Sequence, residues 1–241
     1  MKLVLAEATP RKPRRARGRA RFANLLDAVD EILRDRSDIE ISLQDVAARA
    51  GVPLASIYHY FPNNRAMLLE LANRYLSTFL DLAAQPMKHE SLGHWTDICR
   101  IHAQRSQKFY RENPVAMRLL LGPETGWPIR RADIAVTSQL GEIHYWTHRR
   151  HFKIAEDARL PSVFGNSISI TDSILALSYA QYGQITPELA EEAMRARLSY
   201  LRLYIAELTE KRSEPLPLSV RMLSGPTNDP SRADSHRNLG G

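Results

Sequence analysis

The sequence predicts an all-α protein with an N-terminal three-helix domain that contains a helix-turn-helix, followed by a larger helical C-terminal domain. Three observations support this prediction. Apolar residues recur every three or four positions over most of the chain, which is the period of an amphipathic helix. Proline, glycine and asparagine interrupt these stretches, where helices commonly begin or end. No segment alternates apolar and polar residues in the way that a half-buried β-strand does.

Periodicity and capping residues predict four helices in the N-terminal third. Ser42, followed three residues later by Asp45, has the pattern of a capping box at a helix start. Gly51 can adopt the left-handed conformation that ends a helix, and Asn64 can cap the helix that follows the aromatic segment. The four expected helices are residues 21–35, 43–50, 54–61 and a long helix that begins at 64.

Five further helices are expected beyond this point. Pro114 and Pro187 each stand at an expected helix start, where proline is well tolerated. Residues 213–241 contain proline, serine, glycine and charge in place of periodic apolar residues, which predicts a disordered tail. The five expected helices are residues 91–112, 114–121, 131–152, 167–183 and 187–211.

The composition is typical of a globular protein of a reducing compartment. The chain has 241 residues, of which 44% are apolar, and this length suffices for one large or two small domains. Cys99 is its single cysteine, so no intrachain disulfide can form. No apolar run approaches the roughly 18–20 residues that span a bilayer, and the first residues lack a signal-peptide pattern. We therefore expect a cytoplasmic protein.

Positive charge is concentrated at the N-terminus. Residues 1–21 contain eight lysines and arginines and one glutamate, whereas the whole chain has a formal net charge of +6. Alanine, glycine and proline separate the arginines, so the segment lacks the apolar face of a membrane-binding helix. We expect residues 1–20 to form a disordered basic arm that contacts a polyanion. The alternative is a solvated tail without a partner.

The segment between residues 43 and 61 has the layout of a helix-turn-helix. A tight turn joins two short helices, and Ile57 and Phe61, one turn apart, are expected to face the core. Tyrosine hydroxyls on the outer face would suit DNA phosphates. The alternative is that these tyrosines pack over the following helix. The residues expected to face outward are Ser56, Tyr58, His59 and Tyr60.

Residues 42–71 read SLQDVAARAGVPLASIYHYFPNNRAMLLEL, and this segment resembles the DNA-binding domain of the TetR family of bacterial transcriptional repressors. The resemblance extends over about residues 21–70. Near the other end of the chain, GQITPELAEEAMRARLSYLRLYI resembles the last helix of the family and the turn before it. Between these segments the chain resembles the family only in its helical layout.

The resemblance implies a homodimeric transcriptional regulator, a repressor that a small-molecule ligand releases from a palindromic DNA operator. Residues 21–68 would then be the DNA-binding domain, and residues 69–212 the ligand-binding and dimerisation domain. The expected partners are double-stranded DNA, a second copy of the chain and a small ligand. No membrane partner, no cofactor and no enzymatic activity are expected.

The resemblance also assigns contacts with DNA. The chain departs from the family at Pro53, where a small polar capping residue is common, and at Asn64, where a phosphate-binding lysine is common. Arg65 or the basic arm could supply the missing charge. The residues expected to contact DNA are Arg14, Arg15, Arg17, Arg19, Ser42, Gln44, Pro53, Leu54, Ala55, Ser56, Tyr58, His59, Tyr60, Asn64 and Arg65.

The last expected helix carries two apolar stripes, and the expected helix at 167–183 is apolar around much of its circumference. Pairing with the same helices of a second copy would bury both surfaces. The alternative is a well-buried core within one chain. The expected interface residues are Ile174, Leu177, Met194, Leu198, Leu201, Ile205 and Leu208.

The segment GEIHYWTHRRHF places His144 and His148 on one helix face, as in some zinc sites. Because it lacks the HExxH order and a thiolate cluster, we expect no metal site. We expect instead a ligand pocket, which is mostly apolar with a few polar groups, the alternative being ordinary core and surface positions. The expected lining residues are Trp95, Cys99, His102, Phe109, Met117, Trp127, His144, Tyr145 and Trp146.

Two other classes of function fit the sequence less well. A helical hydrolase or metal enzyme would need a constellation of nucleophile or metal ligands, and none stands out. A protein-interaction adaptor that retains the fold without specific DNA binding is the stronger alternative, because Pro53 and Asn64 weaken the usual contacts.

Overall fold

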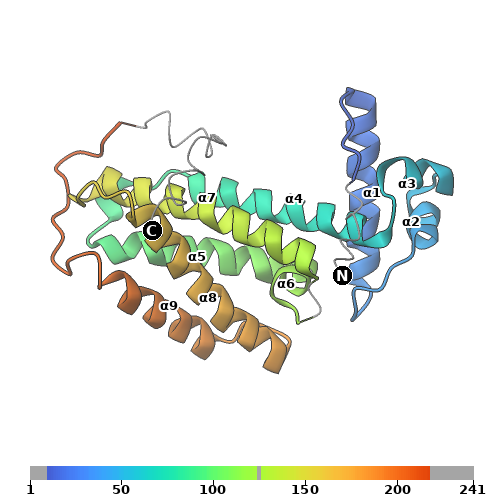
Figure 1. Cartoon of the computed structure of the whole chain (residues 1–241). Coiled ribbons are helices and arrows are strands. Elements are labelled where there is room, and N and C mark those ends of the chain that lie inside the picture. Colours follow the sequence, from blue (N-terminus) through green and yellow to red (C-terminus); the bar gives the residue numbers. More distant parts are fainter. Residues whose placement is uncertain (1–9, 124–125, 218–241) are drawn as a thin grey trace, which may run out of the picture.

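The computed structural model of the chain describes residues 10–123 and 126–217, and these form helices without a β-strand (Figure 1). The all-α prediction is therefore confirmed. None of the helices in the described ranges is both long and apolar enough to cross a membrane. The helices are α1 (Ala16–Arg34), α2 (Leu43–Ala50), α3 (Leu54–Tyr60), α4 (Asn64–Ala84), α5 (Trp95–Glu112), α6 (Pro114–Leu121), α7 (Trp127–His151), α8 (Leu160–Tyr182) and α9 (Pro187–Leu201), with a short 3-10 turn η1 (His89–Ser91) before α5.

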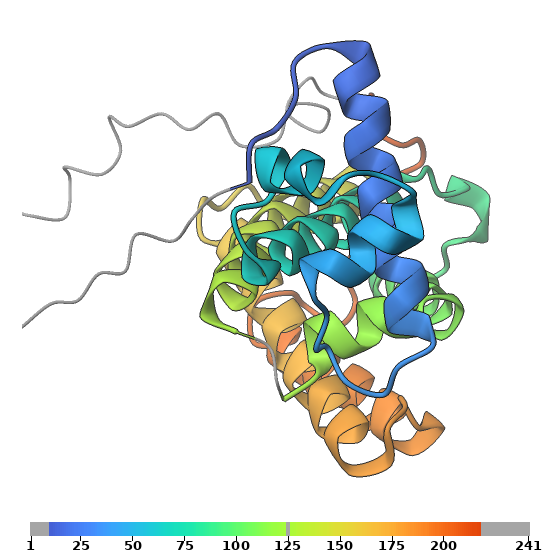
Figure 2. The ribbon, with the colours of Figure 1, turned by 90° about the vertical axis from the view of Figure 1, so that its right-hand side faces the viewer.

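Helices α1, α2 and α3 and the start of α4 form the N-terminal domain around a shared apolar core (Figure 2). Ser42 and Asp45 form the expected capping box at the start of α2, and Gly51 ends that helix with a φ of 63°. The inward positions of Ile57 and Phe61 are also confirmed, since both side chains are fully buried. The cap of α4 differs from the prediction, because the side chain of Asn63, one residue earlier, accepts the Ala66 N–H at 2.8 Å.

Helix α1 begins at Ala16, five residues before the predicted start. The preceding segment folds back onto the domain. The Arg11 N–H donates to the Tyr60 carbonyl at 2.9 Å, and the Lys12 ammonium lies 2.6 Å from the largely buried carboxylate of Glu70. The expectation of a disordered arm is therefore wrong for residues 10–20. Alanine and arginine favour helix even where no apolar stripe reveals it. Residues 1–9 lie outside the described residues.

The C-terminal domain is built on α4, which continues out of the N-terminal domain and packs against α7 (Figure 1). Helix α8 packs against both α7 and α9, so α8 and α9 lie on one side of the molecule. A second cluster of buried apolar residues occupies the end farther from the N-terminal domain, with Trp95 and Phe164 fully buried at its centre. We call the cluster shared with the N-terminal domain the first core and this one the second core.

Helix boundaries in this half match the prediction at α6 and differ at the other helices. Helix α5 begins at Trp95, later than the predicted 91, and α7 begins at Trp127, earlier than the predicted 131. Helix α8 begins at Leu160, earlier than expected, and α9 ends at Leu201, ten residues before the expected end at 211. The chain then turns back to pair with the end of α7, where the Arg212 N–H donates to the His151 carbonyl at 2.9 Å. Leu216 likewise donates to the Arg150 carbonyl at 2.9 Å. Residues up to 217 are thus ordered, and the rest of the predicted tail lies outside the described residues.

The predicted dimer interface is wrong for three of its residues. Leu198, Leu201 and Ile205 are almost completely buried in the second core of their own chain, so they leave no surface for a partner. Met194 packs against the same core and is half-buried. Their apolar stripe reflects burial inside one chain, which is the alternative that the sequence left open. The remaining residues of that set are Ile174, half-buried, and Leu177 and Leu208, both exposed.

Helices α7 and α8 come into close contact at Gly141. A Cβ atom on Gly141 would lie 2.4 Å from the Pro161 carbonyl oxygen and 2.7 Å from the Gly165 nitrogen. These are backbone atoms, which cannot move aside as a flexible side chain does. A Cβ on Gly165 would lie 3.5 Å from the Thr137 carbonyl oxygen and 3.9 Å from Cα of Ser138, both ordinary contact distances. The crossing of α7 and α8 therefore requires glycine at the first position but not at the second.

We expect Gly141→Ala to lower the free energy of unfolding by about 1–3 kcal/mol, the usual cost of overpacking. Gly165→Ala is the matched control and should leave stability unchanged or slightly raised, because alanine favours helix more than glycine does. Chemical denaturation followed by circular dichroism measures both. Equal stability of Gly141→Ala and the wild type would contradict the close crossing.

Candidate nucleic-acid interface and ligand cavity

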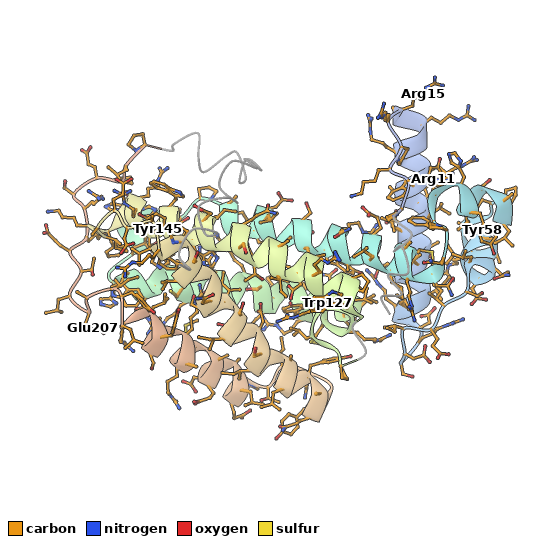
Figure 3. All side chains as sticks on the ribbon, in the orientation of Figure 1. Arg11, Arg15, Tyr58, Trp127, Tyr145 and Glu207 are labelled. Atoms are coloured by element: carbon orange, nitrogen blue, oxygen red, sulfur yellow. The ribbon has the colours of Figure 1, made fainter. Side chains whose placement is uncertain are left out.

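Helix α3 presents a mixed polar and aromatic surface to solvent. Tyr58 is 51% exposed and His59 is exposed beside it, while Leu54 and Ser56 are half-buried. Figure 3 shows Tyr58 on the outer side of α3, away from the C-terminal domain. Pro53 precedes the helix and is exposed, but makes no side-chain cap. Most of the residues expected to read DNA from α3, including exposed Ala55, are thus accessible.

Tyr60 departs from the expected outward arrangement. It is only 8% exposed and packs edge-on against Phe22, with ring centroids 5.7 Å apart. Its carbonyl oxygen accepts the Arg11 N–H. The side chain therefore belongs to the first core and contributes to the stability of the domain, which corrects its assignment as an outward phosphate contact.

Four more expected contacts lie at the starts of α2 and α4, the helices before and after α3. Gln44 is exposed in the first turn of α2, and Asn64 and Arg65 are exposed at the start of α4. Ser42 accepts the Asp45 N–H at 3.0 Å, so its hydroxyl oxygen is engaged while its proton remains available to donate. These positions follow directly from helix boundaries that the sequence predicted.

The free end of α1 carries a cluster of exposed arginines. Figure 3 shows Arg15 at this end, beyond the rest of the N-terminal domain. Within the described ranges, no carboxylate forms an ion pair with these arginines; Arg19 donates to the Arg14 carbonyl at 2.6 Å. By contrast, Arg49 of α2 forms an ion pair at 2.7 Å with Glu31, near the other end of α1. The free end of α1 is therefore a strongly positive surface. Its members, which we call the α1 arginines, are Arg14, Arg15, Arg17, Arg19 and Arg21.

A cavity of about 70 Å³ lies in the C-terminal domain between α4, α5, α7, α8 and α9. This volume holds a few water molecules. Leu76, Phe79 and Leu175 line its apolar side. The opposite side is polar and charged, and its members include His102, Arg105, His144, Asp133, Asp172 and Arg197.

The polar side of the cavity centres on a buried arginine. Arg197 is 3% exposed, and its Nη2 donates to Nδ1 of His144 at 2.7 Å. The rings of His144 and His102 stack with centroids 3.8 Å apart. Burial, together with the nearby charges, holds the pKa of both imidazoles well below the ordinary value, so both are neutral. Nε of Arg197 and Nε2 of His102 are buried without a hydrogen-bond partner among the described residues.

Two carboxyl groups face the same cavity in different states. Arg130 holds Asp133 at 2.5 Å, yet burial raises the pKa of Asp133. Burial, reinforced by the negative charge of Asp133, raises the pKa of Asp172 to about 7. Near neutral pH the cavity therefore contains a permanent guanidinium cation and a carboxyl group that is often protonated.

The structure places only two of the predicted pocket residues, His102 and His144, at this cavity. The predicted pocket is wrong for the other seven. Trp95, Cys99 and Tyr145 are buried in the second core, and Phe109 and Met117 pack on the first core. Trp127 is 63% exposed, and the guanidinium of Arg149 lies over the half-buried ring of Trp146.

Sequence reasoning missed Asp133, Asp172 and Arg197 at the cavity. A signal for Arg197 was present, since it lies four residues after Ala193 and four before Leu201, both buried. A charge on the buried face of a helix needs a partner or a function. Asp172 likewise interrupts the apolar run of α8.

The histidines of α7 do not converge. His144 faces the cavity, whereas Nε2 of His148 lies 3.4 Å from the Cys99 sulfur, and His151 stacks on His89. No group of three or more potential metal ligands is found within the described ranges.

Comparisons with known proteins identify a family model and several relatives. Residues 25–71 match the model of the family described as bacterial regulatory proteins, tetR family. The HTH-type transcriptional repressor Rv1353c of Mycobacterium tuberculosis is 29% identical over 136 residues, which is 56% of this chain and 48% of that protein. The HTH-type transcriptional regulator EthR of M. tuberculosis is 36% identical over 80 residues, or 32% of this chain and 37% of EthR. The matched region thus spans about half the length of the first relative or less.

Solved structures share the fold of the chain. A TetR-family transcriptional regulator from Streptomyces coelicolor superposes with a TM-score of 0.58 at 22% identity, covering 77% of this chain and 99% of that one. Thermus thermophilus FadR, a TetR-family transcriptional repressor solved with lauroyl-CoA, has a TM-score of 0.54 at 20% identity, covering 82% and 100%. At these identities the likeness concerns the fold.

Asp172 should make stability depend on pH. In the unfolded chain its pKa returns to about 3.8, so between pH 4 and 7 the folded state retains a proton that the unfolded state has lost. This contribution to stability is complete below pH 3.8 and is lost as the pH rises through 7. Asp172→Asn removes it, so the variant should gain stability relative to wild type as the pH rises from 5 to 8, by up to about 1.4 kcal/mol per pH unit.

Urea denaturation at several pH values measures this difference in free energy of unfolding. Asp81→Asn, at an exposed position of α4, is the control and should show a constant difference from wild type. A pH-independent difference for Asp172→Asn would show that this carboxyl group ionises as it does in water.

Proposed function

We propose that the chain is a transcriptional repressor of the TetR family, homodimeric and with operator binding controlled by a small molecule in the C-terminal cavity; the match of residues 25–71 to the family model supports this. The observation that carries the proposal is the helix-turn-helix domain, whose exposed α3 surface lies beside a cluster of arginines without counter-charge.

The DNA interface combines α3 with the α1 arginines. Tyr58 and His59 stand exposed on α3 for contacts in or beside the major groove, and Gln44 on α2 is able to pair with adenine through two hydrogen bonds. The α1 arginines offer charge-assisted contacts to phosphates, or to the minor groove. They take the place of the phosphate-binding lysine that Asn64 replaces. In this proposal α2 and α3 read the bases, and the α1 arginines supply most of the electrostatic attraction to DNA.

A second copy of the chain fits the outer surface of α8. Ile170, Ile174 and Leu177 follow one another at steps of four and three on α8; the first two are half-buried and Leu177 is 48% exposed. Tyr182, at the end of the same helix, is 60% exposed. Such an apolar stripe on a surface helix is typical of an interface between subunits. A dimer would place two α3 helices on the two halves of a palindromic operator.

Helix α4 connects the cavity with the N-terminal domain, so it could transmit the effect of a bound ligand to the DNA-binding surface. Leu76 and Phe79 of α4 line the cavity, while Met67 and Leu71 of the same helix are fully buried in the first core below α3. A ligand that displaces the cavity end of α4 would tilt the N-terminal domain, because a continuous helix moves as a rigid element. Thermus FadR was solved with lauroyl-CoA, and this supports the proposal that a protein with this fold accommodates a small molecule.

A protein-interaction adaptor that does not bind DNA is the second candidate. Pro53 and Asn64 favour it, since neither supplies the contact common in the family. The uncompensated α1 arginines favour DNA, because an adaptor would have no need of five adjacent cations.

Footprinting on genomic fragments tests DNA binding directly, and we expect one or more protected palindromic sites. The triple variant Arg15→Gln, Arg17→Gln, Arg19→Gln should bind more weakly at low salt. It should also flatten the plot of log affinity against log salt concentration by about 0.9 for each phosphate that these arginines neutralise in the wild type. Arg195→Gln, an exposed arginine of α9, is the matched control and should change neither. Failure to retain any fragment specifically would favour the adaptor.

Leu177→Arg tests the dimer. A charge at the centre of an apolar interface would be buried without a partner, so the variant should be a folded monomer at micromolar concentration. Leu203→Arg, at a residue that is 76% exposed and outside the α8 stripe, should remain dimeric. Sedimentation velocity distinguishes the two states. A wild-type protein that is monomeric at the same concentration would refute the proposed interface.

A further inference from the structure

The cavity of the C-terminal domain contains a cation without an anion. Arg197 is 3% exposed, and its hydrogen bond within the described ranges goes to the neutral imidazole of His144. Its Nε has no partner there. Leaving a buried charge uncompensated is costly, and a guanidinium carries five N–H donors arranged to meet a planar anion. The polar side of the cavity is therefore incomplete as it stands.

The carboxyl groups of the cavity do not supply the missing counter-charge of Arg197. Asp133 is held by Arg130 at 2.5 Å. Asp172 lies near enough for the charge of Arg197 to act on its pKa, but that pKa is raised to about 7, whereas a direct ion pair would lower it. Asp172 forms no ion pair with Arg197 within the described ranges, and because it is only partly ionised it neutralises the guanidinium at most in part. The site therefore still lacks negative charge.

A second unpartnered group lies beside the first. Nε2 of His102 is buried without a partner among the described residues, and the His102 ring stacks on the imidazole that Arg197 contacts. A neutral imidazole donates one hydrogen bond from a ring nitrogen. Arg197 and His102 therefore offer donors from two helices, α9 and α5, to an acceptor with two oxygen atoms.

We propose that the effector of this cavity is a small organic monocarboxylate, whose carboxylate binds Arg197 and His102 and whose apolar part lies against Leu76, Phe79 and Leu175. This inference deepens the proposed function, since it names the chemical class of the effector. Arg197 is the buried cation that lacks a counter-charge, and it matches one negative charge; Arg105 also lines the cavity, but its guanidinium donates to the backbone carbonyls of Leu82, Gln85 and Pro86. A phosphate dianion would bring a second charge toward Asp133 and Asp172. A cationic ligand would face Arg197 itself. The cavity volume of about 70 Å³ favours a short acid.

Calorimetry on the full-length wild-type protein tests the charge requirement without any substitution. The probes are butyrate, hexanoate and benzoate, each compared with its primary amide, which has nearly the same shape but no charge. At least one acid should bind ten-fold or more tightly than its amide and raise the melting temperature. Sodium phosphate at equal ionic strength should not stabilise the protein. If no acid binds, if acid and amide bind equally, or if phosphate stabilises as well as the acids, the proposal is overturned.

Variants of Arg197 then test whether this residue supplies the positive charge that binds the acid. Arg197→Gln should abolish the preference for acid over amide, while Arg197→Lys should weaken acid binding and retain the preference, because lysine keeps the charge but not the planar donors. Arg195→Gln, two residues away and outside the cavity, should bind the acid as the wild type does. An undiminished acid preference in folded Arg197→Gln would overturn the proposal. Should that variant fail to fold, the wild-type comparison of acid with amide decides alone.

Adding operator DNA separates this inference from the proposed function. An acid that binds through Arg197 but leaves the operator complex intact supports the carboxylate site and refutes ligand-controlled repression. A neutral or cationic compound that displaces the protein from DNA through the same cavity, where no acid binds, refutes the carboxylate site and supports ligand-controlled repression.

Discussion

The continuity of α4 through both domains is the constraint on which the rest of the structure depends. The Asn63 side chain caps its first turn, its early residues Met67 and Leu71 are buried in the first core, and Leu76 and Phe79 reach the cavity. A helix of 21 residues is about 31 Å long and has no internal joint unless its hydrogen bonds are broken. The position of α3 relative to the cavity is therefore fixed by one rigid element, and packing against α7 fixes that element in turn.

The C-terminal domain accommodates polar groups where a simple helical bundle would be apolar. Arg197 follows Ala193 of the first core and precedes Leu201 of the second core, so the polar groups of the cavity lie at the boundary between two apolar clusters. An apolar residue at this position would join the two clusters and stabilise the bundle more than an uncompensated guanidinium does. The arginine at this position is accounted for if, as we propose, stability is reduced in return for recognition of a ligand.

The sequence predicted those features of the structure that a few neighbouring residues determine, and it did not predict features that depend on contacts between distant parts of the chain. The capping box at Ser42, the left-handed Gly51 and the burial of Ile57 and Phe61 are determined within a few residues, and the structure has all of them. The early start of α1 was not predicted, because the first turns of this helix bury little surface and therefore show no periodic apolar residues. The early end of α9 and the burial of Leu201 within its own chain were not predicted. Periodicity shows that one face of a helix is buried, but not whether the same chain or a second copy buries it. Asp172 and Arg197 come together only in three dimensions.

The folded-back segment before α1 has a mechanical consequence. Arg11 is hydrogen-bonded to the last residue of α3, and Lys12 is ion-paired with Glu70 of α4, so the stretch that leads into the arginine cluster is anchored both to α3 and to the helix that spans the domains. If the proposed repressor binds DNA through these surfaces, the arginines and α3 would move together with α4. A tilt of α4 would then release both sets of contacts in a single step, and the protein would not remain on DNA by its charge alone.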